Sequence, residues 1–245
     1  MTQEYPNKIS PCPIVETTIN IKCSLKVPKE ALVGVIYNPL QQVYGEQILI
    51  VRSTPLASIP DAIREQDPNL RNRPTAEILC PEGRLQFGQN NIFIGLNMPY
   101  SSWDNAHKFI DKILNTIIQL NIISNVEHVS LKYLDFFSEI NIFNQINLNI
   151  VWPQKDNICS RSTAFKTELM NNGFVHVLQI TNSVHLKNEY LHIDNDGSLI
   201  DLTTLCLEVD VQNMINKINE CHTESKRFFF ELLKKEFIET LSPEY

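Results

Sequence analysis

The stretch AEILCPEGRLQFGQNNIFIGL, residues 76–96, decides the fold class of this chain. Its apolar residues come in three short runs, separated by PEG and by GQNN, which are rich in residues that favour turns. The stretch therefore predicts three short strands that follow one another through tight turns. Strands that come in such a block, with no helix between them, are typical of antiparallel sheets.

A helix follows this block, and the order then repeats. Residues 101–122 carry apolar side chains every three or four positions, and either of the first two serines can cap the helix start. Residues 126–137 alternate as a strand. The chain then predicts further strands and a closing helix. We therefore expect an α+β fold in which two long helices pack on one face of an antiparallel sheet.

The second block of strands lies between residues 165 and 211. We expect four strands there, with turns at NNG (171–173), TNS (181–183) and DNDG (194–197). The closing helix should begin near Val211 or Asn213 and run to about Leu241.

The first residues of the chain fit the same fold class. Residues 13–25 alternate as a strand, and residues 29–45 favour a helix that Pro39 must break or kink. We predict one compact unit made of two α+β halves, residues 1–137 and 138–245, each with a meander of strands followed by a long helix. A distant duplication would explain this shared order, although the sequence shows no self-match between the halves.

Composition argues against several classes of protein. The net charge is −7 and no run of five like charges occurs, which argues against a broad basic surface for nucleic acid. The six cysteines form no C-x-x-C pair, so we expect reduced thiols and no metal or cofactor. No secretory signal and no run of 18 apolar residues occurs, so we expect a cytoplasmic protein that does not contact the membrane.

Five short motifs occur in an order that resembles a known protein family. They are Pro13-Ile14-Val15-Glu16, Tyr100-Ser101-Ser102-Trp103, Lys132-Tyr133-Leu134-Asp135, Leu207-Glu208-Val209-Asp210, and His222 with Phe228-Phe229-Phe230. Together they span nearly the whole chain and resemble a sporadically distributed, uncharacterised prokaryotic family. The third motif departs from that family, which usually has Arg and Asn where this chain has Lys132 and Asp135, and a lysine cannot make a bidentate guanidinium contact. The resemblance implies a soluble accessory protein without known catalytic residues.

The closing helix carries the first candidate site. His222 and Ser225 interrupt its apolar stripe near the centre, and Arg227 lies beside them. Either these residues face a polar pocket between helix and sheet, or His222 is a core histidine whose ring nitrogens find structural partners. The three consecutive phenylalanines that follow cannot all face inward, so we expect Phe228 and Phe230 to offer surface to a partner.

Three residues outside that helix are further candidates for binding. A buried Glu16 would need a partner, for which Lys132 is the candidate, unless both lie on an ordinary solvated strand face. Trp103 stands at a helix start, where an aromatic ring either covers a ligand or fixes the helix to the sheet.

These features favour a non-catalytic regulatory or interaction protein, because a full core comes without any catalytic motif. The patchy distribution of the resembling family implies a prokaryotic defence or toxin–antitoxin cassette, with the chain as its immunity, accessory or sensor component. We expect a protein partner encoded nearby, and a homodimer is compatible with the sequence. The alternative is an enzyme or a small-ligand sensor with a polar pocket under the closing helix around His222.

Overall fold

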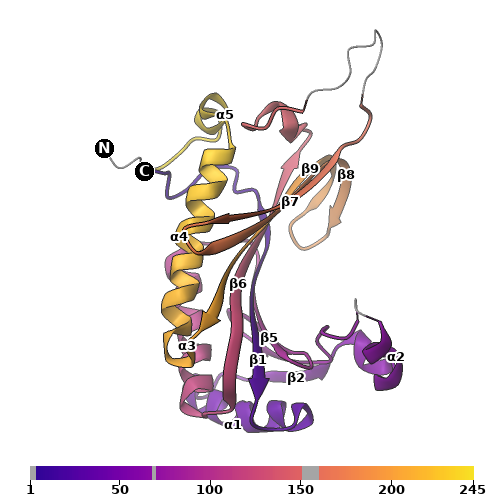
Figure 1. Ribbon diagram of the computed structural model, residues 1–245, viewed down its shortest axis with the longest axis vertical. Helices are drawn as coiled ribbons and strands as arrows, with labels where there is room; N and C mark the ends of the chain where they lie inside the picture. Colours follow the sequence, from indigo (N-terminus) through magenta and orange to yellow (C-terminus); the bar gives the residue numbers. More distant parts are fainter. Residues whose placement is uncertain (1–3, 68–69, 151–159) are drawn as a thin grey trace.

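A computed structural model describes residues 4–67, 70–150 and 160–245 of the protein (Figure 1). Its strands are β1 (Ile14–Leu25), β2 (Ile50–Ser53), β3 (Ala76–Cys80), β4 (Gly83–Phe87), β5 (Asn91–Leu96), β6 (Ile123–Ser138), β7 (Ala164–Asn171), β8 (Phe174–Asn188) and β9 (Ile193–Val209). Its α-helices are α1 (Leu32–Tyr44), α2 (Asp61–Gln66), α3 (Trp103–Gln119), α4 (Met214–Leu232) and α5 (Lys235–Thr240). Within this described part, the strands form a nine-stranded sheet in the order β2-β3-β4-β5-β1-β6-β9-β8-β7.

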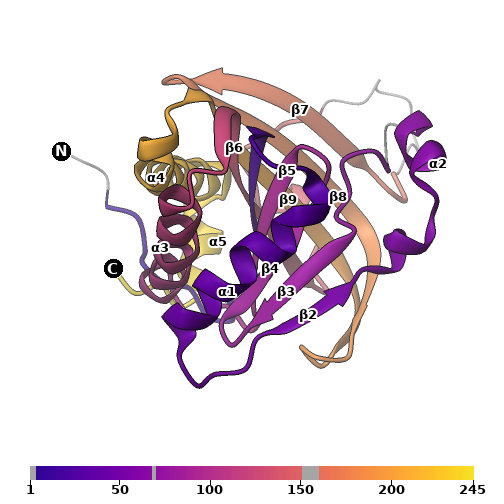
Figure 2. The same ribbon diagram turned by 90° about the horizontal axis from the view of Figure 1, so that it is seen from below.

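Every neighbouring pair of strands in this sheet is antiparallel, and helices pack against it. This arrangement confirms the predicted α+β class. Figure 2 shows α1, α3 and α4 next to one another along one side of the curved sheet, whereas α2 stands apart. We call the helix-covered side the inner face and the opposite side the outer face.

The alternation of side chains along β1 explains this two-sided sheet. Thr17, Ile19, Ile21 and Cys23 are buried on the inner face, while the residues between them stay partly exposed on the outer face. A period of two is what an antiparallel strand with one covered side requires. The apolar stripe of α3 packs on this inner face, and Ser102 caps the helix by accepting a hydrogen bond from the backbone N–H of Asn105 at 3.3 Å.

Two hydrophobic clusters fill the space between helices and sheet. The first joins β1, β3, β4, β5 and β6 to α1, α3 and the start of α4, and it includes Met214 and Cys221. The second lies under the end of α4 and under α5, and it includes Ile9 and Phe137. Each cluster therefore contains residues from both sides of the predicted boundary at 137/138, and the sheet runs through that boundary without a break.

The second strand block differs from the expectation of four strands. β8 and β9 are two long strands, and the turn between them falls at residues 189–192 instead of at DNDG. At TNS the chain makes a bulge, because the side chain of Asn182 accepts from the backbone of Thr163 and Ser183 donates to the backbone of Arg161. These polar side chains form hydrogen bonds with residues 161–163 and do not form a turn. A turn-like sequence therefore remains inside a strand as a bulge.

The closing helix is also shorter than expected. α4 ends at Leu232, and Leu233 adopts an extended conformation that bridges to Ile146, with the backbone N–H of Lys234 donating to Gln145 at 2.8 Å. This pairing with a distant segment interrupts the helix before α5 begins. Helix α1 continues through Pro39 without a break, although the sequence predicted that this proline must break or kink the helix.

No helix in the described residues is both long enough and apolar enough to cross a lipid bilayer.

Candidate functional site

A cavity of about 400 Å³ lies under α4. Its walls come from β6, from the start of α3, from α4 and from the N-terminal segment, which we define as residues 5–13. Figure 1 shows that α4 continues past the first turn of α3, so the inner face of the sheet has no second helix here. Small-molecule sites in proteins commonly have volumes in this range.

The lining of this cavity brings together residues from four of the five motifs. They are Pro13 and Ile14; Tyr100, Ser101, Ser102 and Trp103; Tyr133 and Asp135; and His222, Phe229 and Phe230. These segments are far apart in the sequence and meet only in the folded chain. The residues of these four motifs that face inward therefore line the same cavity.

His222 lies in the wall of the cavity with its ring nearly enclosed. Its Nδ1 atom is hydrogen bonded to the hydroxyl of Tyr133 at 2.9 Å, and Tyr133 is in turn hydrogen bonded to Tyr100. The ring stacks on Trp103 with 4.0 Å between centroids and 8° between planes. Burial, and then the positive charge of Lys226, lowers the pKa of His222 to about 4. The imidazole is therefore neutral at pH 7 and has a structural partner.

Trp103 combines the two roles that its position allows. Its indole N–H donates to Asn219 on α4 at 3.1 Å, and Asn219 is also hydrogen bonded to His107 of α3 at 2.6 Å. These contacts fix α3 to α4. The same ring lines the cavity, so it also forms part of the surface that a ligand would touch.

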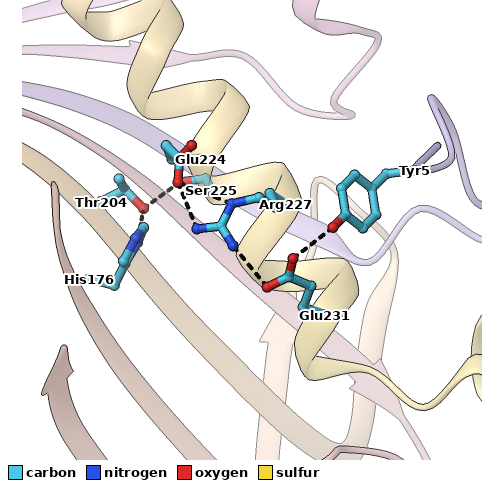
Figure 3. Close-up of polar contacts among 7 residues, drawn as sticks. All are labelled: Tyr5, His176, Thr204, Glu224, Ser225, Arg227 and Glu231. Atoms are coloured by element: carbon cyan, nitrogen blue, oxygen red, sulfur yellow. Dashed lines mark hydrogen bonds and ion pairs between the residues drawn. The ribbon is translucent and has the colours of Figure 1, made fainter. Parts of the chain in front are cut away.

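Ser225 connects the cavity to a buried polar chain on the sheet. Its hydroxyl donates to Thr204 on β9 at 2.7 Å, and the Thr204 hydroxyl is hydrogen bonded to Nδ1 of His176 on β8 at 2.9 Å (Figure 3). All three side chains are buried, and within the described residues Nε2 of His176 has no hydrogen-bond partner. Ser225 was a predicted site residue, whereas Thr204 and His176 were not.

Arg227 points away from the cavity and along the surface of α4. Its guanidinium group pairs with Glu224 at 2.7 Å and with Glu231 at 2.9 Å, and Glu231 accepts a hydrogen bond from Tyr5 at 2.7 Å (Figure 3). Arg227 therefore helps to attach the N-terminal segment to α4 and does not line the cavity.

Glu16 and Lys132 lie together on the outer face of the sheet. Their charged groups are 3.4 Å apart, and Lys132 is also 3.4 Å from the carboxylate of Asp201. The sheet separates them from His222. The structure thus pairs these two predicted residues with each other but does not bring them to the pocket under α4.

The phenylalanines of α4 are less exposed than we expected for a partner surface. Phe230 is buried, and the ring of Tyr5 stacks over it at 6.2 Å. Phe228 is half-buried and stacks on His176 at 4.8 Å, while Phe229 lines the cavity. The N-terminal segment covers Phe230, and the role of Phe228 and Phe230 as partner surface stays a prediction.

Asp135 is the site residue that the sequence analysis missed. It lines the cavity, its side chain is only 2% exposed, and within the described residues no hydrogen bond or ion pair reaches its carboxyl group. Burial, together with the negative charge of Asp201, raises the pKa of Asp135 to about 8. Its position two residues after Tyr133 on an alternating strand was the available signal, since it places Asp135 on the inner face.

The described residues contain no group of three His, Cys, Asp or Glu side chains that could hold a metal ion. Cys23, Cys80, Cys206 and Cys221 are buried free thiols, Cys12 is exposed, and Cys159 lies outside the described residues.

No protein-family model and no curated protein matches this chain.

Proposed function

We propose that this protein binds a small molecule in the cavity under α4 and acts as a sensor or regulator. The observation that carries this proposal is the buried, unpaired carboxyl group of Asp135 in the wall of a 400 Å³ cavity. A buried polar group without a partner is costly, so folded proteins seldom keep one unless something else binds it. Ligand sites combine apolar walls with a few such polar groups.

The surroundings of His222 favour binding over catalysis. Its ring is neutral at pH 7, and its Nδ1 atom is engaged with Tyr133. Glu16 and Lys132, the charged candidates outside α4, pair with each other on the outer face. Among the described residues that line the cavity, none thus forms an arrangement in which a base activates a nearby nucleophile.

A fragment screen with a single-tryptophan reporter tests this proposal. The chain has only two tryptophans, so Trp152→Phe leaves Trp103 as the sole emitter. We expect some fragments to change Trp103 emission and, at 100 times their Kd, to raise Tm by roughly 5–10 °C. Leu202→Trp, which fills the cavity from β9, should abolish the rise in Tm, and it is left out of the emission assay because it adds a tryptophan.

Two outcomes would contradict the proposal. The first is that fragments raise Tm equally in the cavity-filled variant, which would place their binding elsewhere. The second is that a chemically broad fragment set changes neither Tm nor emission.

A second candidate function is self-association through the edge strand β2. Every residue of β2 is exposed, and Ile48, Ile50 and Val51 are 82%, 54% and 46% exposed. An apolar strand edge of this kind pairs readily with another strand, and pairing with a second copy satisfies two-fold symmetry.

We expect the Ile50→Lys, Val51→Lys double variant to remain monomeric at concentrations where the wild type dimerises, as measured by light scattering. Met170→Lys on β7, the opposite edge, is the matched control, and a wild type that is monomeric throughout contradicts this candidate.

Membership in the resembling family, a partner encoded nearby, a defence setting and a cytoplasmic location stay predictions.

A further inference from the structure

We propose that the ligand is a small aromatic cation whose amine or amidine group pairs with Asp135. This inference rests on the proposed function and specifies the chemistry of the ligand. A carboxylate accepts up to four hydrogen bonds and donates none, so its natural partner is a group with several N–H donors. A positively charged donor makes the strongest of these contacts.

The walls around Asp135 suit a flat apolar ring. Tyr100 meets Tyr133 edge to face, with 6.1 Å between centroids and 87° between planes. Phe229 and Leu202 add apolar surface, and all four residues line the cavity. Aromatic side chains bind rings through stacked and edge-to-face contacts, and their electron-rich faces attract cations.

Two other charged groups of the cavity wall already have partners, and a third, Asp104, lies exposed at the start of α3. Lys8 forms an ion pair with Glu244 at 3.0 Å, and the ammonium group of Lys226 donates to Asn7 at 2.8 Å. The imidazole of His222 is neutral. Asp135 is thus the buried ionisable group in this wall with which a cationic ligand could pair.

Proton release should accompany the binding of a cation. The empty site holds Asp135 in its protonated form at pH 7, because its pKa is raised to about 8. Binding a protonated amine or amidine then ionises the carboxyl group, and one proton leaves to solvent. Affinity should therefore weaken about tenfold for each pH unit below 8 and level off above it.

Several titratable groups line the cavity with Asp135: Lys8 and Cys12 of the N-terminal segment, Tyr100 and Asp104 around the start of α3, Tyr133 of β6, and His222 and Lys226 of α4. Asp201 of β9 acts on Asp135 from the outer face of the sheet, where it pairs with Lys132. The pKa of Tyr100 is raised to about 12 and that of His222 is lowered to about 4, both outside the range from pH 6 to 8. A variant without the Asp135 carboxyl group separates its contribution from all of theirs.

Benzamidine, benzamide and benzoate form a probe series that differs in charge but hardly in shape. We expect calorimetry at pH 8 to show that benzamidine binds, and that benzamide and benzoate bind at least tenfold more weakly. Asp135→Asn should weaken benzamidine binding roughly 10- to 100-fold and remove its pH dependence. Asp194→Asn, the same change on an exposed residue of β9, should leave both unchanged.

Lys226 allows an independent test of the sign of the ligand's charge. Lys226→Ala removes a positive charge from the cavity wall, so it should tighten the binding of benzamidine. An anionic ligand would lose affinity from the same change.

Three results would overturn the inference: equal binding of benzamide or benzoate, unchanged benzamidine affinity in Asp135→Asn, or neutral and anionic fragments that bind the cavity while benzamidine does not. The last result would leave the proposed function standing. A cavity that binds no fragment of any charge would remove both.

Discussion

Asp135→Asn is expected to become more stable than the wild type as the pH rises from 4 to 8. The folded protein holds the pKa of Asp135 at about 8, against an ordinary value of 3.8 in the unfolded chain. Between these two values the folded state keeps a proton that the unfolded state has lost, so raising the pH favours unfolding. The free energy of unfolding of the wild type therefore falls by ~1.4 kcal/mol per pH unit from this group alone. Because asparagine does not titrate, the variant does not lose this free energy of unfolding as the pH rises.

Urea unfolding at pH 4.5, 6.0 and 7.5 measures this effect as the difference between variant and wild type. That difference should grow steadily with pH and become constant above pH 8. Glu168→Gln on β7 is the control, since the Glu168 side chain is exposed to solvent. Parallel stability curves for Asp135→Asn and wild type would show that the pKa of this carboxyl group is close to its ordinary value in the folded protein.

Thr204→Val is expected to destabilise the fold by about 2–6 kcal/mol. Valine has nearly the shape of threonine, so the change leaves no cavity but removes the hydroxyl between Ser225 and His176. Two buried polar groups then lose their partner, and each such loss costs about 1–3 kcal/mol. His176 would be affected most, because its other nitrogen already lacks a partner among the described residues.

Thr204→Ser separates the hydrogen bonds from the packing. It keeps the hydroxyl and removes one methyl group, which should cost about 1 kcal/mol. Urea unfolding of both variants at one pH gives the comparison. Equal destabilisation by Thr204→Val and Thr204→Ser would mean that the hydrogen bonds of Thr204 add no stability beyond the packing of its side chain.

The parts of the fold that could be predicted are those whose signals are local. α3 carries its own capping serine and its own apolar stripe, so its position follows from a single stretch of sequence. The bulge at Ser183 and the end of α4 at Leu232 depend instead on distant backbone groups, those of Arg161 and of residues 145–146. Local patterns therefore suggested a turn and a longer helix where tertiary contacts produce neither.

The candidate site was predictable only in part, for a similar reason. A polar interruption in an apolar helix drew attention to His222 and Ser225, and both do line the cavity. Alternation along β6 would also have placed Asp135 on the inner face. Its burial could not be read from that strand, because the cover over this part of the sheet comes from α4 and from the first residues of the chain.

The first described residues of the chain and its last residues lie side by side (Figure 1), and residues 6–9 also line the cavity. The backbone N–H of Asn7 donates to Glu244 at 2.6 Å, and that of Ser10 donates to Leu241 at 2.7 Å. An affinity tag fused at either end would thus begin its path close to the cavity wall. Such a tag could obstruct entry or occupy the space itself, so apparent dissociation constants should be compared before and after proteolytic tag removal.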